Sequence, residues 1–186
     1  MKNKLSTKKI AMVAMMAALT VAGSALRIKV PASVVGTSAF HLGNILCALS
    51  GILLGPTLGG LAAGLGSAIY DMFDPMYIAE SWLTFLMKGA YGVAAGLVAW
   101  SGKKKWGYGK AAAGTTVGAV LYAVLYLGKT YLKGVYVKGL TSAASLLALT
   151  EKILPTTFNA VVAIIFAPIL AVAIRKALEK NHLTLE

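Results

Sequence analysis

The stretch GPTLGGLAAGLGSAIYDMFDP, residues 55–75, combines a long apolar run with several glycines and ends in the carboxylates Asp71 and Asp74. A helix in water would be destabilised by so much glycine, and a glycine-rich loop does not need so much leucine and alanine. Glycine is more frequent in membrane helices, where small residues let neighbouring helices approach closely. The stretch therefore indicates a membrane helix whose glycines pack against another helix.

The whole chain has the composition of a membrane protein. It has 186 residues, of which 58% are hydrophobic and 13% charged, and its mean hydropathy is +0.76. A soluble domain carries about 25% charged residues, whereas apolar stretches long enough to cross a bilayer recur along this chain. We therefore predict one all-α, polytopic membrane domain over residues 1–186, with a short surface helix at 140–151. Pro56 and its glycine neighbours should turn the chain sharply between the second and third of six transmembrane helices, expected at about residues 8–27, 38–54, 57–73, 81–100, 111–128 and 151–174.

Basic residues predict how these helices are oriented. Lys and Arg are enriched in cytoplasmic loops. With the N-terminus inside, eleven of them fall on the cytoplasmic side, and five fall outside: Arg27, Lys29, Lys129, Lys133 and Lys138. Both termini are therefore predicted to be cytoplasmic. The same rule explains the net charge of +12, including the run at 103–105, without a nucleic-acid partner.

The sequence carries no motif for a reaction. LGKT at residues 127–130 resembles the end of a phosphate-binding loop, but Ala123 stands where that motif needs glycine, and no strand precedes it. His41 and His182 are far apart, and the single cysteine, Cys47, lies in an apolar run, so neither a metal site nor a disulfide is indicated. The chain is not expected to be an enzyme or to hold a cofactor or a metal.

Three polar side chains inside the predicted helices point toward one region. Asn44, Lys88 and Asn159 lie several residues into the second, fourth and sixth helices, which all run inward from the outer surface. They reach a similar depth at about 1.5 Å per residue, and helical side chains tilt toward the N-terminus of their helix, which here means outward. A lysine inside the membrane is costly. Lys88 is therefore expected to extend to the surface, to pair with Asp71 or Glu151, or to contact a ligand.

Aromatic residues accompany this polar set. Trp82 and Phe85 precede Lys88 at helical spacing, and Tyr122 and Tyr126 share one face of the fifth predicted helix. Such residues also anchor helices at membrane interfaces, so anchoring is the alternative interpretation. Flat apolar walls with a few polar groups are typical of a small-molecule pocket, and here they would suit a flat heterocycle.

Two further residues belong to this candidate pocket. His41 lies one turn above Asn44, and Asp71 marks the outer end of the third predicted helix. Asp71 is expected at the pocket rim, either as a gate residue or as a counter-charge for Lys88. The basic residues at the outer mouth would suit an anionic or carbonyl-rich ligand, although four acids on the same side weaken that inference.

The first predicted helix carries a ladder of small residues at Ala14, Ala18 and Ala22. Such a ladder lets another helix approach closely, so this face is expected either to pack internally or to dock a partner membrane subunit. Methionines at positions 12, 15 and 16 would offer an adaptable surface beside it.

Four segments carry a resemblance to a known family: AMVAMMAAL at 11–19, FHLGNILCALSGILLGPTLGGLAAGLGSAIYDMFDP at 40–75, TFLMKGAYGVAAGLVA at 84–99 and LPTTFNAVVAII at 154–165. With the size and the six expected helices, they resemble the substrate-binding S component of an energy-coupling factor (ECF) transporter. The glycine-rich helix that ends in an acid, followed by FLMKG, is the more specific part of this resemblance.

The resemblance implies a subunit of a prokaryotic plasma membrane importer that binds a water-soluble vitamin or similar micronutrient, a flavin-like heterocycle being favoured. Such subunits associate with a membrane-embedded coupling subunit and two cytoplasmic ATPases, so ATP hydrolysis would belong to the partners. Ala14 and Ala18 match the family motif that contacts the coupling subunit. The outer connections would gate the pocket, at 28–37, 74–80 and 129–150.

Two other functions remain open from the sequence. A self-sufficient small permease or channel would need ion-coupling residues through the full depth of the membrane, and the inner halves of these helices offer almost none. A membrane scaffold without transport activity would leave Lys88 and the two asparagines unexplained.

Overall fold

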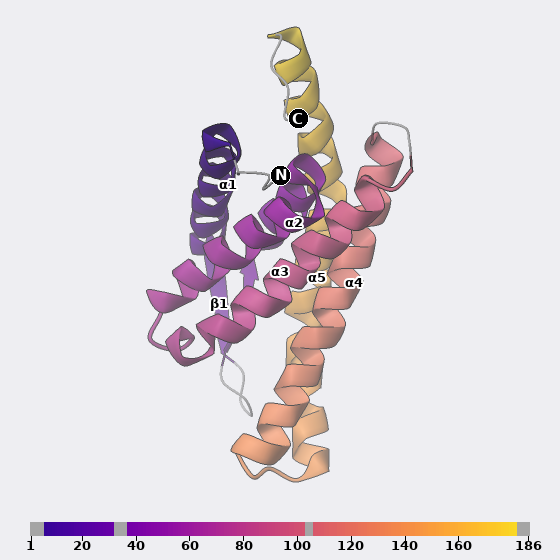
Figure 1. The fold of residues 1–186 in the computed structure, drawn as a ribbon. Coiled ribbons are helices and arrows are strands. Elements are labelled where there is room, and N and C mark those ends of the chain that lie inside the picture. Colours follow the sequence, from indigo (N-terminus) through magenta and orange to yellow (C-terminus); the bar gives the residue numbers. More distant parts are fainter. Residues whose placement is uncertain (1–5, 32–36, 103–105, 182–186) are drawn as a thin grey trace.

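The computed structural model describes residues 6–31, 37–102 and 106–181. Long helices dominate it, and helices that follow one another in the chain pack against each other (Figure 1). The elements in chain order are α1 (Thr7–Ala25), β1 (Arg27–Pro31), β2 (Thr37–His41), α2 (Gly43–Met72), a 3-10 turn (Ile78–Glu80), α3 (Ser81–Ala99), α4 (Tyr108–Leu132), a π-helical turn (Lys133–Val137) and α5 (Ser142–Lys180).

Five helices in the described residues are long and apolar enough to cross a membrane, not the six that the sequence predicts. The difference lies in α2, which contains both the second and the third predicted helices. Gly55 interrupts α2 with a non-helical backbone (φ 78°, ψ 177°) just before Pro56. A Cβ built on Gly59 would lie 2.5 Å from the Cα of Gly51, so the two halves of α2 fold back against each other. The predicted break is therefore present, as a tight bend inside one helical element.

The expectation of an all-α chain is wrong at one place. Residues 27–31 and 37–41 form an antiparallel hairpin in which Arg27 pairs with His41 and Pro31 with Thr37. The sequence RIKVP alternates branched apolar with charged side chains, a pattern that favours a strand, and it is too short to cross a bilayer. The predicted first helix consequently ends at Ala25.

The separate surface helix expected at 140–151 is also absent, because α5 runs without interruption from Ser142 to Lys180. Thr141 caps its start, since the Thr141 side chain accepts a hydrogen bond from the backbone N–H of Ala144. Pro155 lies inside the helix, which is tolerated in a membrane helix where neighbours compensate for the lost hydrogen bond.

Glycines hold α2 and α3 together at backbone distance. A Cβ on Gly51 would lie 2.1 Å from the carbonyl oxygen of Gly92, and one on Gly96 would lie 2.6 Å from Pro56 Cα. Only glycine fits such contacts. The close packing predicted from the glycine-rich stretch is confirmed, since a Cβ on Gly64 would lie 2.7 Å from the carbonyl oxygen of Phe85 on α3. We call the contacts of Gly51, Gly92 and Gly96 the glycine seam.

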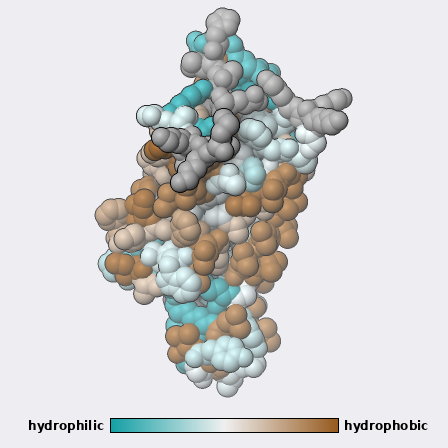
Figure 2. All heavy atoms as spheres, in the orientation of Figure 1, coloured by the Kyte–Doolittle hydropathy of each residue, from teal (hydrophilic) through white to brown (hydrophobic). Residues whose placement is uncertain are grey.

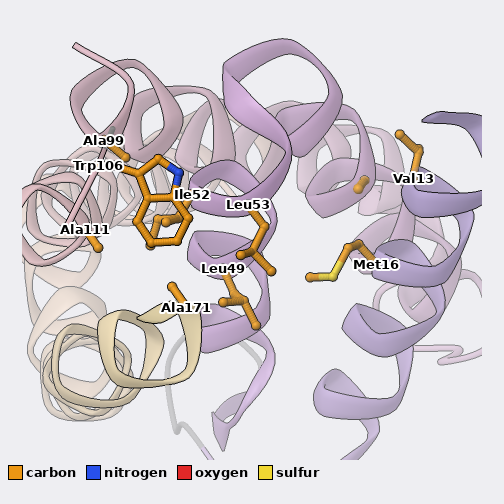
Figure 3. Close-up of a cluster of buried hydrophobic side chains, with 10 residues drawn as sticks. Val13, Met16, Leu49, Ile52, Leu53, Ala99, Trp106, Ala111 and Ala171 are labelled. Atoms are coloured by element: carbon orange, nitrogen blue, oxygen red, sulfur yellow. The ribbon is translucent and has the colours of Figure 1, made fainter. Parts of the chain in front are cut away.

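A buried apolar cluster joins α1 to the rest of the bundle (Figure 3). Val13 and Met16 face Leu49 and Leu53 of α2, and Ile52 lies beneath the ring of Trp106. Met16 is only 3% exposed, so it belongs to the core and not to an adaptable surface. The expected ladder of Ala14, Ala18 and Ala22 faces outward, since all three are exposed.

The surface and the chain direction agree with a membrane-embedded bundle. Figure 2 shows hydrophobic residues gathered in a broad belt across the middle of this face, with hydrophilic residues toward the upper end and in a patch below the belt. Along α4 and α5 the exposed side chains include Val124 at 63% and Phe158 at 50%. The start of α1 and the end of α5 lie toward the same end of the molecule (Figure 1).

Candidate functional site

A cavity of about 150 Å³ lies where the hairpin meets the helix ends. Its wall combines the end of α1, strand β2, the end of α2, the start of α3, the end of α4 and the first turns of α5. These ends are opposite the start of α1 and the end of α5 (Figure 1). Six of the nine pocket residues predicted from the sequence line it: His41, Asp71, Lys88, Tyr122, Tyr126 and Asn159.

Lys88 lies at the inner end of this cavity. It is on α3 and is only 5% exposed, so it does not extend to the surface. Its ammonium group donates a hydrogen bond to Oδ1 of Asn44 and lies 3.9 Å from the centre of the Tyr122 ring. Asn44 is itself buried and therefore acts on the site through Lys88. Among the described residues, no carboxylate forms an ion pair with Lys88, so neither expected acidic partner neutralises it.

Asn159 pairs with the edge of strand β2. Its Oδ1 accepts a hydrogen bond from the backbone N–H of His41 (3.0 Å), and its Nδ2 donates one to the carbonyl of Ala39 (2.8 Å). A side-chain amide bound in this way replaces the peptide group of a third strand. Asn159 thus fixes the hairpin to α5 and shapes the cavity wall.

Three stacked tyrosines lie beside Lys88, and two of them line the cavity. Tyr91 and Tyr122 are stacked with ring centres 6.0 Å apart, and Tyr122 and Tyr126 are stacked at 5.8 Å with planes 19° apart. Tyr122 and Tyr126 line the cavity, whereas Tyr91 is fully buried behind them. Their spacing leaves a wall against which a planar ring can stack.

Trp82 and Phe85 are placed elsewhere. Trp82 is 61% exposed and does not line the cavity. Phe85 packs against α2, since a Cβ on Gly64 would lie 3.0 Å from Cδ2 of its ring. The structure therefore leaves Trp82 exposed outside the cavity and gives Phe85 a packing contact with α2.

Arg27 connects the hairpin to the C-terminal end of α2. Its guanidinium lies 3.7 Å from Asp71 and 3.8 Å from Asp74, and its Cζ lies 3.9 Å from the centre of the Tyr70 ring. Asp71 is thus a partner of Arg27 at the cavity rim rather than an ion-pair partner of Lys88. The two carboxylates at the end of the glycine-rich stretch hold the hairpin in place.

Charged groups outside the membrane helices reinforce this contact. Lys29 binds Asp74 at 2.7 Å. Burial alone would raise the pKa of Asp74, but the hydrogen bonds from Lys29 and from the N–H of Met76 lower it below its usual range.

His41 of strand β2 is uncharged in the folded protein. Burial lowers the pKa of His41 well below its usual range, and Lys88 adds to this effect. His41 is therefore a neutral imidazole that accepts a hydrogen bond from the N–H of Gly43.

Comparison with known proteins identifies the family. A family model described as "ECF-type riboflavin transporter, S component" matches residues 4–176. The chain belongs to this family of S components. A solved structure titled "Structure and mechanism of the S component of a bacterial ECF transporter" shares its fold, with a TM-score of 0.59 and 16% sequence identity over 94% of this chain and 96% of the other. A relative from Pyrococcus woesei, described as "Uncharacterized protein in gap 3'region", is 33% identical over 114 residues, which is 61% of this chain and 72% of the relative.

Membership of the family establishes the general role of the chain. This S component is a substrate-binding subunit of an ECF transporter, a multi-pass protein of a prokaryotic plasma membrane, and not an enzyme. S components bind small molecules and work with membrane coupling and ATPase modules. In the described residues there is no group of three or more His, Cys, Asp and Glu side chains that could hold a metal ion.

The cavity wall also contains residues that the sequence did not indicate as pocket residues, Lys152, Thr84 and Thr156, beside lysines that were expected at the outer mouth. Lys129 and Lys133 both bind the carboxylate of Glu80. Lys152 is only 3% exposed and donates a hydrogen bond to the carbonyl of Thr37. These residues complete the wall together with Thr84, Lys138 and Thr156.

A helical pattern could have found several of these residues. Lys152 and Thr156 precede Asn159 by seven and three residues, so all three share one face of α5. Thr84 lies one turn before Lys88 on α3. The sequence did not indicate Lys152 because the predicted helix began at residue 151, so the lysine was expected at the end of a helix. In the structure α5 begins at Ser142, and Lys152 lies within it, in the cavity wall.

Proposed function

We propose that this S component binds a flat, flavin-like heterocycle in the cavity between the hairpin and the helix ends. The observation that carries the proposal is the stacked pair of Tyr122 and Tyr126 beside the buried Lys88 ammonium. The tyrosines offer a flat surface for a ring, and Lys88 offers donors to ring carbonyls, since only one of its three N–H groups is used by Asn44. The family description names riboflavin, which has both features.

We further propose that the chain crosses the membrane six times, with both termini in the cytoplasm and the cavity outside. The bend at Gly55 returns the chain, so that the two halves of α2 count as separate crossings. The start of α1 and the end of α5 lie at the same end of the molecule (Figure 1). Basic residues Lys8, Lys9, Arg175 and Lys176 gather at that end, as expected for a cytoplasmic side.

The partner contact is proposed to be the outward face of α1. Ala14, Ala18 and Ala22 are exposed, while Met16 and Thr20 on the opposite face are buried. A membrane coupling subunit could approach this face at backbone distance. It would be joined by two cytoplasmic ATPases, which supply the energy for import.

The test is to identify the small molecule that the purified protein retains. The protein is purified in mild detergent, denatured, and its released molecules are analysed by mass spectrometry, while riboflavin binding is followed by quenching of flavin fluorescence. We expect a flavin or a related fused heterocycle to be released and riboflavin to bind with one-to-one stoichiometry. Release of an aliphatic compound, with no flavin binding, would refute the proposed ligand.

A second measurement separates this function from a self-sufficient permease. Ala18→Leu should abolish uptake by the complete transporter while the isolated subunit binds its ligand as before, because the added volume lies on the docking face. Val21→Leu, at a half-buried position of the same helix, is the matched control. Uptake into vesicles that contain this chain alone would instead favour the permease.

A further inference from the structure

The cavity carries more positive charge than the protein itself compensates. Seven cationic side chains lie in its wall or next to it: Arg27, Lys29, Lys88, Lys129, Lys133, Lys138 and Lys152. Four acids accompany them: Asp71, Asp74, Glu80 and Glu151. Three positive charges therefore remain in excess, and two of the seven cations, Lys88 and Lys152, are buried.

The ion pairs show where this excess is located. Arg27 and Lys29 use the carboxylates of Asp71 and Asp74. At the outer end of the cavity, Lys129 and Lys133 share the single carboxylate of Glu80. Half of that lysine pair is therefore uncompensated, and the neighbouring wall adds Lys138 and Lys152, with Glu151 next to Lys152 as the further acid.

Lys152 is the most deeply buried of these outer cations. It is 3% exposed, and its ammonium donates to the backbone carbonyl of Thr37. No carboxylate of the described residues forms an ion pair with it, although Glu151 is its neighbour in the chain. A neutral carbonyl uses one of the three N–H donors of a lysine, so donors remain for another acceptor.

The outer lysines come from two facing elements. Lys129 and Lys133 are one helical turn apart at the end of α4 and in the π-helical turn, and Lys152 and Thr156 are one turn apart on α5. All four line the same cavity, as does Lys138. Groups on successive turns of two helices can surround one small anion, and a charge buried without compensation is unfavourable.

We propose that the substrate carries a negatively charged group, a phosphate or a carboxylate, which binds between Lys152 and the lysine pair at Lys129 and Lys133. This inference rests on the proposed function, because it places the ring of the same substrate against Tyr122 and Tyr126 and the charged group at the outer end. The preferred ligand is then an anionic heterocycle and not a neutral one.

The test compares riboflavin with riboflavin 5′-phosphate, which differ by one phosphate group. Dissociation constants for the purified protein are measured by flavin fluorescence at low and at high salt. We expect the phosphate to bind at least tenfold more tightly at low salt, and the preference to shrink as salt rises. Lys152→Gln should reduce the preference to less than threefold, Lys152→Arg should retain it, and Lys176→Gln, at an exposed lysine at the other end of α5, should leave it unchanged.

The outcomes separate this inference from the proposed function. If riboflavin binds as tightly as its phosphate or more tightly, the anionic substrate is refuted and flavin binding stands. If neither flavin binds, the proposed flavin ligand fails, and the molecule released from the purified protein decides the present inference. A released anion supports it, and a released neutral compound overturns it.

Discussion

The glycine seam and the polar cavity hold the same helices together by different means. At the seam, backbone meets backbone, since a Cβ on Gly51 would lie 2.1 Å from the Gly92 carbonyl oxygen. At the cavity, side chains such as Arg27 and Lys88 join elements through charged hydrogen bonds and aromatic faces. At the seam the two helix backbones cannot move apart or closer without losing or straining these contacts. At the cavity, the side-chain contacts can break while every helix keeps its backbone hydrogen bonds.

The strongest test of this contrast is a methyl group added to the seam. Gly51→Ala forces the Gly92 carbonyl away, and overpacking of this kind costs about 1–3 kcal/mol or more. We expect a clear fall in the melting temperature of the detergent-purified protein and a loss of monodisperse material in size-exclusion chromatography.

The matched control is Gly128→Ala on α4, where nothing lies within 4 Å of the added Cβ. Alanine is the better helix former by about 1 kcal/mol, so this variant should be as stable as the parent or more stable. Equal melting temperatures for the two variants would show that the seam is looser than described.

A smaller effect is expected when the charge at the inner end of the cavity is removed. Lys88→Met keeps the length of the side chain but loses the donors and the contact with Tyr122. A hydrogen bond to a charged group contributes about 1.5–3 kcal/mol, so flavin binding should weaken about 10- to 100-fold in fluorescence titrations. Lys176→Met serves as the control, and an unchanged affinity of Lys88→Met would remove Lys88 from the proposed site.

A mutation at the contact between the hairpin and α2 should have a smaller effect again. Arg27→Lys preserves the charge but cannot span Asp71 and Asp74 while lying over Tyr70. We expect the bound ligand to dissociate about tenfold faster, with the association rate nearly unchanged. Lys29→Gln is the comparison, because the Lys29 side chain is 43% exposed and exposed ion pairs contribute little. Similar dissociation rates for both variants would argue against Arg27 as the holding contact.

The smallest effect concerns pH. The pKa of Asp74 is lowered in the folded protein, so its contribution to stability is present above the ordinary aspartate pKa and is lost as the pH falls through the lowered value. Asp74 therefore adds no pH dependence between pH 8 and pH 5, whereas His41, whose pKa is lowered in the folded hairpin, gains a proton only when the hairpin opens. Protection of the hairpin amides from hydrogen exchange, corrected for the intrinsic rate, should stay nearly constant above about pH 7 and fall by about fourfold at pH 6. Constant protection down to pH 5 would show that His41 is not held as a buried, neutral imidazole.

The sequence predicted the helices and their close packing, but it did not predict the hairpin that connects α1 to α2. The glycine-rich stretch predicted close packing and the break beside Pro56, because both depend on local chemistry. The strand at 27–31 was missed, since an isolated strand is specified by its partner at 37–41 and by Asn159, which lies far away in the sequence.

The candidate site shows the same limit. Helix depth correctly brought Lys88 and Asn159 to one cavity, because rise per residue and side-chain tilt are fixed by helix geometry. The partners of Lys88 and Asp71 were not predictable, because opposite charges suggested a pair, while the fold gives Asp71 to Arg27 and places Lys88 against Asn44. Which charged side chains become neighbours depends on how the helices and the hairpin cross in space.

In the proposed topology, the bend at Gly55 also affects the depth of the cavity in the membrane. The first half of α2, from Gly43 to Leu54, is about 18 Å long at about 1.5 Å per residue, while the hydrocarbon core is about 30 Å thick. Either the bilayer thins beside this half-helix or the hairpin lies below the level of the lipid head groups. The second arrangement is favoured by side chains of α5 that already bind three peptide groups of β2: Asn159 binds those of His41 and Ala39, and Lys152 binds the carbonyl of Thr37. A substrate arriving from outside would then pass the head-group layer before it meets its first tyrosine.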